Sequence, residues 1–191
     1  VGLCIPDLTN GFAKAYNRKL KNAALPADVQ LQNVHRGIMQ HFEGDRRFHS
    51  SAAFIQEVKD TTHTFVETGL DRNRIRLSVV AHLAVELMID RQIVRQHPNV
   101  CNEYYRIVDS ADQTALFSYF NSFGLETEKM VFLERFAFFR QRRFLYLFDE
   151  LENIVFGLNR IYSSVTGTGF TELEKERFLT ALRNIDGRIR Y

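Results

Sequence analysis

The chain has 191 residues, which is enough for one domain with a substantial hydrophobic core. Its 25 Lys and Arg and 23 Asp and Glu leave a net charge of +2, too small to indicate nucleic-acid binding. With only 3 Pro and 10 Gly, the sequence has few turn signals, which argues against an all-β fold.

The N-terminal segment is a short apolar stretch broken by Pro6, with Asp7 directly after the break. It begins at Val1 as if inside a structural element, which suggests that the native N-terminus lies further upstream. Cys4 and Cys101 lack C-x-x-C spacing, so a reducing compartment is the default. No apolar run approaches the roughly 18 residues that span a bilayer, and no signal-peptide pattern is visible. We therefore predict a cytoplasmic protein with no membrane partner.

Helical periodicity dominates from residue 28 onward. We predict helices over 28–49, 50–69, 71–97, 102–110 and 110–124, two helices or one bent helix over 126–163, a loop at 166–169, and a final amphipathic helix. Thr171 and Glu174 form the capping box that starts the final helix. Seven or eight helices and no strand predict an all-α bundle in a single domain over 1–191. A metal-site half would cover about 1–97, and a Phe/Arg-rich half about 98–191.

His41, Asp45 and His49 fall at four-residue intervals on the first long helix. A step of four advances about 40° around a helix, so the three side chains share an arc of roughly 80°. They border the core-facing residues Val34, Ile38 and Phe42. His41 and His49 are about 12 Å apart along the axis, too far for one metal on a straight helix. We therefore favour His41 and Asp45 as metal ligands, and His49 as a group that hydrogen-bonds to a ligand, contacts the substrate or acts as the catalytic general acid.

Gly44 lowers the helix propensity beside Asp45 by about 1 kcal/mol relative to Ala. A close neighbour or a bend at this point would explain why a glycine is tolerated in the middle of the helix.

The segment 77–90 is apolar nearly all round, which predicts a buried helix. His82 and Glu86 interrupt it four residues apart, and Asp90 continues the series. A buried carboxylate costs several kcal/mol unless it is paired or bound to a metal. Two packed helices that each carry a His-x3-carboxylate set could surround one point with ligands suited to Mn, Fe, Zn or Ni.

A structural interpretation stays open for each cluster, because His–carboxylate hydrogen bonds also occur without a metal. His63 and His97 are predicted at the surface and at a helix end, and His35 on a helix surface. The segment 132–148 mixes Phe with arginines that would form either a solvated face or a basic patch: Arg135, Arg140, Arg142 and Arg143. Arg72, Arg74 and Arg76 are two residues apart, so on a helix they would not share a face.

Residues 37–45, GIMQHFEGD, resemble the G-I-x-x-H-x-x-x-D segment of bacterial acyl carrier protein phosphodiesterases, which are related to HD-domain metal phosphohydrolases. The segment GLCIPDLTNGF is similar to the start of that family, where an Asp follows an apolar run, and LPADV matches its lead-in. The chain departs from the family pattern at Phe48 and His49, and at His82, where the family has an Asp. The resemblance covers about the first 90 residues.

The resemblance implies an all-α, HD-like fold and a metal site with Mn²⁺ as the most typical ion, Fe or Zn being alternatives. It implies that the partner is acyl carrier protein or another phosphoester substrate. It also implies that Asp7, His41 and Asp45 are metal-site residues. Together with His82 and Glu86 they would hold one or two ions. We therefore expect a metal-dependent phosphodiesterase, with a non-catalytic helical module that binds an acidic partner as the alternative.

Overall fold

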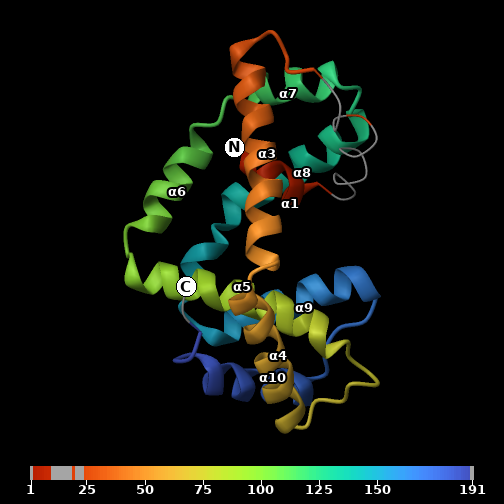
Figure 1. Cartoon of the computed structure of the whole chain (residues 1–191), viewed down its shortest axis with the longest axis vertical. Coiled ribbons are helices and arrows are strands. Elements are labelled where there is room, and N and C mark those ends of the chain that lie inside the picture. The colour runs from red at the N-terminus through yellow and green to blue at the C-terminus, as the bar shows by residue number, and fades with distance from the viewer. Residues whose placement is uncertain (1, 10–18, 20–23, 190–191) are drawn as a thin grey trace. The chain divides into compact units, whose positions relative to one another are not determined.

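The computed structural model describes residues 2–9, 19 and 24–189, and all regular secondary structure in these ranges is helical (Figure 1). The prediction of an all-α protein is confirmed. The elements are η1 (Gly2–Cys4), α1 (Ile5–Leu8), α3 (Val29–His49), α4 (Ala52–Glu67), α5 (Leu77–Gln96), α6 (Val100–Asp109), α7 (Gln113–Ser122), α8 (Glu126–Arg142), η3 (Phe144–Leu147), α9 (Leu151–Thr166) and α10 (Glu172–Ile185). None of these helices is long and apolar enough to cross a membrane.

Most predicted helix ends agree with the structure to within a few residues, but α5 begins only at Leu77. The preceding residues form turns, because Asp71 accepts hydrogen bonds from the backbone of Asn73 at 2.8 Å and of Ile75 at 2.9 Å. The segment 126–163 is two helices. α8 ends where Arg143 adopts a left-handed conformation with φ 47°.

The chain divides into two compact units. Unit 1 comprises Val1–Phe48 and Asn102–Arg143, and unit 2 comprises His49–Cys101 and Phe144–Tyr191. Each unit therefore takes segments from both of the halves expected from the sequence. The expectations of a single domain and of an HD-like arrangement stay predictions.

Unit 1 has its own hydrophobic core, to which α1, α3, α7 and α8 contribute. Val34 and Ile38 are buried in it as their spacing predicts, and Phe42 packs at its edge. Phe132 stacks on Phe136 with ring centroids 5.0 Å apart. These two phenylalanines of the Phe/Arg-rich segment are therefore core residues.

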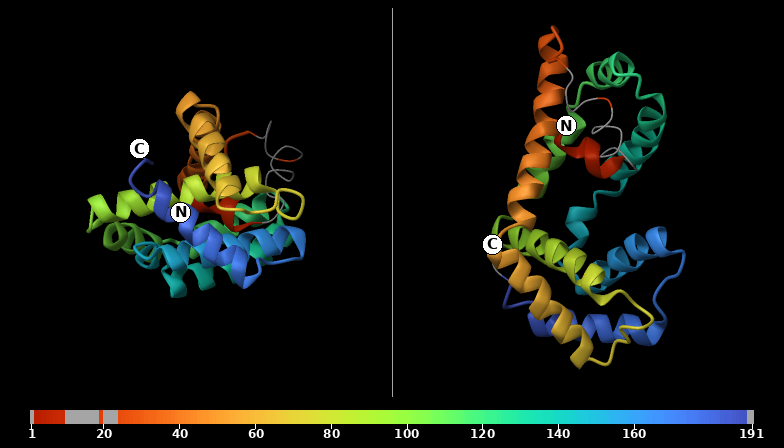
Figure 2. Two further views of the ribbon diagram at one scale, coloured as in Figure 1. Left: turned by 90° about the horizontal axis from the view of Figure 1, so that it is seen from below. Right: turned by 45° about the vertical axis from the view of Figure 1, so that its right-hand side comes forward.

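Unit 2 is built from α4, α5, α9 and α10, which Figure 2 shows from two further sides. α5 packs against both α4 and α9, and α10 also packs against both of them. Phe65 and Phe178 meet edge to face with centroids 4.9 Å apart in this core. This packing holds α4 and α5 in place. The candidate site includes residues of α5 and lies beside the start of α4.

Candidate metal centre

Three potential metal ligands meet in unit 2: His49, His82 and Glu86. The Nε2 atom of His49 lies 2.8 Å from Oε1 of Glu86, and Nε2 of His82 lies 3.3 Å from the same oxygen. One ligand atom from each residue lies within 4.8 Å of the other two. Among the described residues, no other group of three His, Cys, Asp or Glu side chains meets this condition.

The junction between α3 and α4 explains the position of His49. His49 is the last residue of α3, and Ser51 caps α4 by accepting a hydrogen bond from the backbone of Phe54 at 3.2 Å. The Phe54 ring lies against both imidazoles, with centroids 5.1 Å from His49 and 4.9 Å from His82. Since Phe54 is buried in the core of unit 2, it provides a fixed apolar wall beside the two histidines.

His82 and Glu86 form the pair that their four-residue spacing predicts, and most apolar residues of their helix are buried as predicted, but the helix is not buried on all sides. Their side chains are 40% and 32% exposed, and Val79 on the same helix is 44% exposed. α5 therefore has a solvent side, and Glu86 requires no partner on grounds of burial alone. The His82 and Glu86 side chains are therefore partly exposed to solvent.

Asp90, the next residue in the series, contributes elsewhere in unit 2. Burial, together with the negative charge of Asp90, raises the pKa of the Cys101 thiol. The carboxylate of Asp90 therefore acts on the cysteine rather than joining the His49–His82–Glu86 group.

The other predicted metal-site residues come together in unit 1. His41 Nε2 lies 3.5 Å from Asp7 Oδ1 and 3.4 Å from Asp45 Oδ2. The imidazole side chain is 13% exposed, whereas those of Asp7 and Asp45 are 72% and 49% exposed. The structure thus groups the six predicted residues as two sets of three, one in each unit. A single site that combines both sets stays a prediction.

Gly44 has no close neighbour among the described residues, since a Cβ built there would meet no atom within 4 Å. Among these residues, a close contact does not account for this glycine. Gly11, which belongs to the segment GLCIPDLTNGF that is similar to the start of the family, lies outside the described residues.

A second feature of the same region of unit 1 is the contact between Tyr104 and Cys4, whose hydroxyl oxygen and Sγ lie 3.6 Å apart. Burial, followed by the neighbouring Cys4 thiol, strongly raises the pKa of Tyr104, and the charge of Asp7 adds to the effect. Tyr104 is therefore a neutral hydrogen-bonding group at neutral pH.

His35, predicted on a helix surface, is buried in unit 1. Its Nδ1 lies 3.0 Å from the Tyr119 hydroxyl, and its ring stacks on Phe123. Burial lowers the pKa of His35, which favours the neutral imidazole. The signal that could have found it is its position three residues before Ile38, on the core-facing arc of α3.

The remaining histidines agree with their predictions. His63 is exposed and lies 3.1 Å from Glu67, one turn further along α4. His97 is exposed at the C-terminal end of α5. The His63–Glu67 pair has the same spacing as His82 and Glu86, but no third ligand joins it among the described residues.

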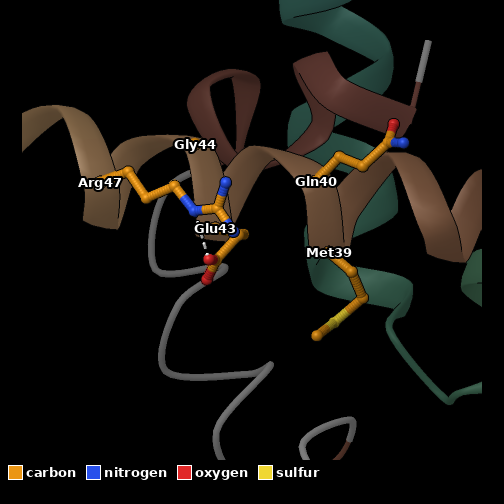
Figure 3. Close-up of a pocket in the computed structure, with 5 residues that line it drawn as sticks. All are labelled: Met39, Gln40, Glu43, Gly44 and Arg47. Carbon is orange, nitrogen blue, oxygen red and sulfur yellow. Dashed lines mark hydrogen bonds and ion pairs between the residues drawn. The ribbon is translucent and has the colours of Figure 1, made fainter.

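A pocket on α3 in unit 1 is lined by Met39, Gln40, Glu43, Gly44 and Arg47 (Figure 3). Arg47 reaches Glu43 across its edge at 2.6 Å, as the dashed line in Figure 3 marks. Hydrogen bonds from Arg46 and Arg47 lower the pKa of Glu43. Because these charges already compensate one another, we assign no ligand to this pocket.

The arginines of the Phe/Arg-rich segment are largely engaged within unit 1. Arg140 and Arg143 reach Asp109 at 3.2 and 2.6 Å. The Arg142 guanidinium lies over the ring of Phe138, 5.3 Å from its centroid. Arg140 and Arg143 therefore share their charge with a carboxylate, which weakens the segment as a patch for an acidic partner.

Comparisons with protein-family models, with curated proteins and with solved structures find no significant match. The resemblance to acyl carrier protein phosphodiesterases therefore stays a prediction from the motifs.

Proposed function

We propose that the chain binds a divalent metal ion through His49, His82 and Glu86 and uses it to hydrolyse a phosphoester. The observation that supports this is the approach of two imidazole nitrogens from different helices to one carboxylate oxygen, at 2.8 and 3.3 Å.

The His82–Glu86 separation of 3.3 Å is close to that of two ligands on one ion, whereas the His49–Glu86 contact of 2.8 Å would widen when an ion binds. Ligand atoms around a tetrahedral metal at about 2.1 Å lie about 3.4 Å from one another. Two His and one carboxylate form a ligand set used by Zn and by non-haem Fe, and His and carboxylate ligands also bind Mn. Three protein ligands leave at least one position for water or substrate, which distinguishes catalytic from structural sites.

The chemistry follows from the ligand set. A divalent ion at this position would lower the pKa of a bound water and stabilise negative charge on a phosphoryl oxygen. Phe54 would fix the orientation of both imidazoles through its ring contacts. In this proposal His49 is a metal ligand, whereas the sequence predicts a support for a ligand, a substrate contact or a general acid.

The resemblance extends the proposal to a substrate and to a second set of residues. It suggests acyl carrier protein carrying its phosphopantetheine arm, Mn²⁺ as the ion, and Asp7, His41 and Asp45 as further metal-site residues. These three parts of the proposal rest on the motifs alone.

The test is a calorimetric titration of chelator-treated protein with Mn²⁺ and, separately, with Zn²⁺. We expect binding near one ion per chain at the unit 2 site, and at least tenfold weaker affinity in His49→Ala, His82→Ala and Glu86→Gln. The matched controls are His63→Ala and Glu67→Gln, which alter an exposed pair with the same spacing. Equal affinity in the ligand variants and the controls would reject the site.

Hydrolysis is tested separately with bis(p-nitrophenyl) phosphate and with holo acyl carrier protein. We expect metal-dependent turnover that falls in the three ligand variants. Metal binding without turnover of either substrate would retain the metal site and reject the enzyme. Absence of metal binding would leave the cluster as a hydrogen-bond network, as in the alternative of a binding module.

A further inference from the structure

We propose that unit 2 binds the phosphoryl group of a ligand in a pocket beside the first turn of α5, which is lined by both Arg72 and Arg76. The pocket is lined by Thr62, Val66, Arg72, Arg76, Leu77, Ser78 and Val79. All of these residues belong to unit 2, and the proposal does not depend on a metal at His49, His82 and Glu86.

The turns before α5 explain why arginines two residues apart have different surroundings. On a helix, Arg72, Arg74 and Arg76 would point in different directions. Here they lie outside the helix, in turns held by Asp71. Arg74 reaches Glu174 at 3.0 Å and the carbonyl oxygen of Gly169 at 3.1 Å, whereas Arg72 and Arg76 both line the pocket.

Arg72 and Arg76 differ from most arginines of the chain in their contacts. Within the part of the chain that the structure describes, neither guanidinium has a carboxylate or carbonyl partner, and the hydrogen bonds of Arg76 are made by its backbone. The backbone at Arg76 is nevertheless fixed, because its N–H donates to the Tyr162 hydroxyl at 3.3 Å. Both arginines are exposed, so water screens their charges in the free protein, and both charges are available to an anion in the pocket.

The remaining lining residues favour a phosphoryl group with an organic substituent. Guanidinium groups bind phosphate oxygens through paired, charge-assisted hydrogen bonds, and two guanidinium groups match a doubly charged phosphate better than a carboxylate. The Ser78 hydroxyl can donate a further hydrogen bond, whereas that of Thr62 already donates to the carbonyl of Val58 at 2.7 Å. Val66, Leu77 and Val79 add an apolar wall for the substituent.

The pocket and the candidate metal centre share the helix α5. Ser78 precedes His82 by four residues, which is one helical turn or about 6 Å along the axis. The pocket and the His49–His82–Glu86 group are therefore neighbours along one helix.

The experiment is a titration of the full chain with inorganic phosphate, followed by NMR or calorimetry, with EDTA present so that the metal centre does not contribute. The variants are Arg72→Gln, Arg76→Gln and the double variant. The charge-matched control is Arg36→Gln with Arg46→Gln, which removes the same charge from exposed positions of α3 in unit 1. Thermal unfolding confirms that each variant is folded.

We expect each pocket variant to bind phosphate about tenfold more weakly and the control to bind like wild type. Acetate should bind more weakly than phosphate to the wild-type chain. Absence of phosphate binding, an equal loss in the control, or acetate binding as tight as that of phosphate would overturn the proposal. Because EDTA is present throughout, none of these results depends on the proposed metal site.

Discussion

His49 and Glu86 are 37 residues apart in the sequence, and their side chains meet at 2.8 Å between Nε2 and Oε1. One is the last residue of α3 and the other lies in the middle of α5. Their contact turns an ordinary i,i+4 pair on α5 into a group of three potential ligands. The ligand set therefore depends on where α3 ends.

The proposed metal site predicts that binding of a divalent ion raises the stability of the fold. A ligand that binds only the native state adds about 2.7 kcal/mol to the free energy of unfolding at 100 times its dissociation constant. Saturating Mn²⁺ or Zn²⁺ should therefore raise the melting temperature of chelator-treated protein, measured by circular dichroism. Glu86→Gln should lose this increase, whereas Glu67→Gln should keep it. Equal increases in the two variants would show that the ion binds elsewhere.

Substitution of Arg91 should cause a large loss in the free energy of unfolding. Its side chain is 7% exposed and binds both carboxylate oxygens of Asp186, at 3.0 and 3.2 Å. It also donates to the carbonyls of Phe148, at 3.0 Å, and of Asp149. Removing one partner of a buried ion pair costs about 3–5 kcal/mol. Since Asp186 is 24% exposed and keeps its contact with Arg95, we expect the low end of this range. Urea unfolding of Arg91→Ala should show a loss of this size.

Arg95 provides the matched control for Arg91. It contacts Asp186 and Asp149 as well, but its side chain is 48% exposed. Exposed ion pairs contribute about 0–1 kcal/mol, so Arg95→Ala should lower the free energy of unfolding by no more than that. Equal losses in the two variants would contradict the assignment of the stabilisation to burial.

The helices and the His82–Glu86 pair could be predicted because periodicity and i,i+4 spacing are local properties. The exposure of Glu86 could not be predicted, because the apolar content of α5 does not show which side of the helix is left uncovered by other helices. The rise along the helix predicts that His41 and His49 do not bind the same ion, and in the structure His41 contacts Asp7 and Asp45 whereas His49 contacts Glu86. The contact between His49 and Glu86 depends on the turn at Ser51. Residue spacing along one helix does not predict that turn.

Arg91 and His35 show the same limit. Arg91 follows Asp90 in the sequence and looks like an ordinary charged residue near the end of a helix. Its burial arises from Asp186 and two carbonyls that are distant in the chain. His35 is polar and was assigned to the surface, whereas the Tyr119 hydroxyl makes its burial possible.

His35 predicts a pH dependence of stability. Burial lowers its pKa in the folded state below the ordinary value of 6.5. The unfolded chain therefore takes up a proton that the native state resists, and stability is lost as the pH falls from above 6.5 through the lowered pKa. The free energy of unfolding should fall over this range in wild type and fall less in His35→Gln. Identical slopes in the two proteins would contradict the effect of burial.

The capping box of α10 predicts a graded response to substitution. Thr171 accepts from the Glu174 backbone at 3.3 Å, and the Glu174 carboxylate accepts from the Thr171 backbone at 2.7 Å. Thr171→Ala should cost about 1 kcal/mol, and Thr171→Ser should cost less because serine keeps the oxygen. Glu174→Ala should cost more than Thr171→Ala, since the buried carboxylate also pairs with Arg74 at 3.0 Å. Urea unfolding of the three variants gives this order, and a Glu174→Ala loss no larger than that of Thr171→Ala would show that the Arg74 pair adds nothing.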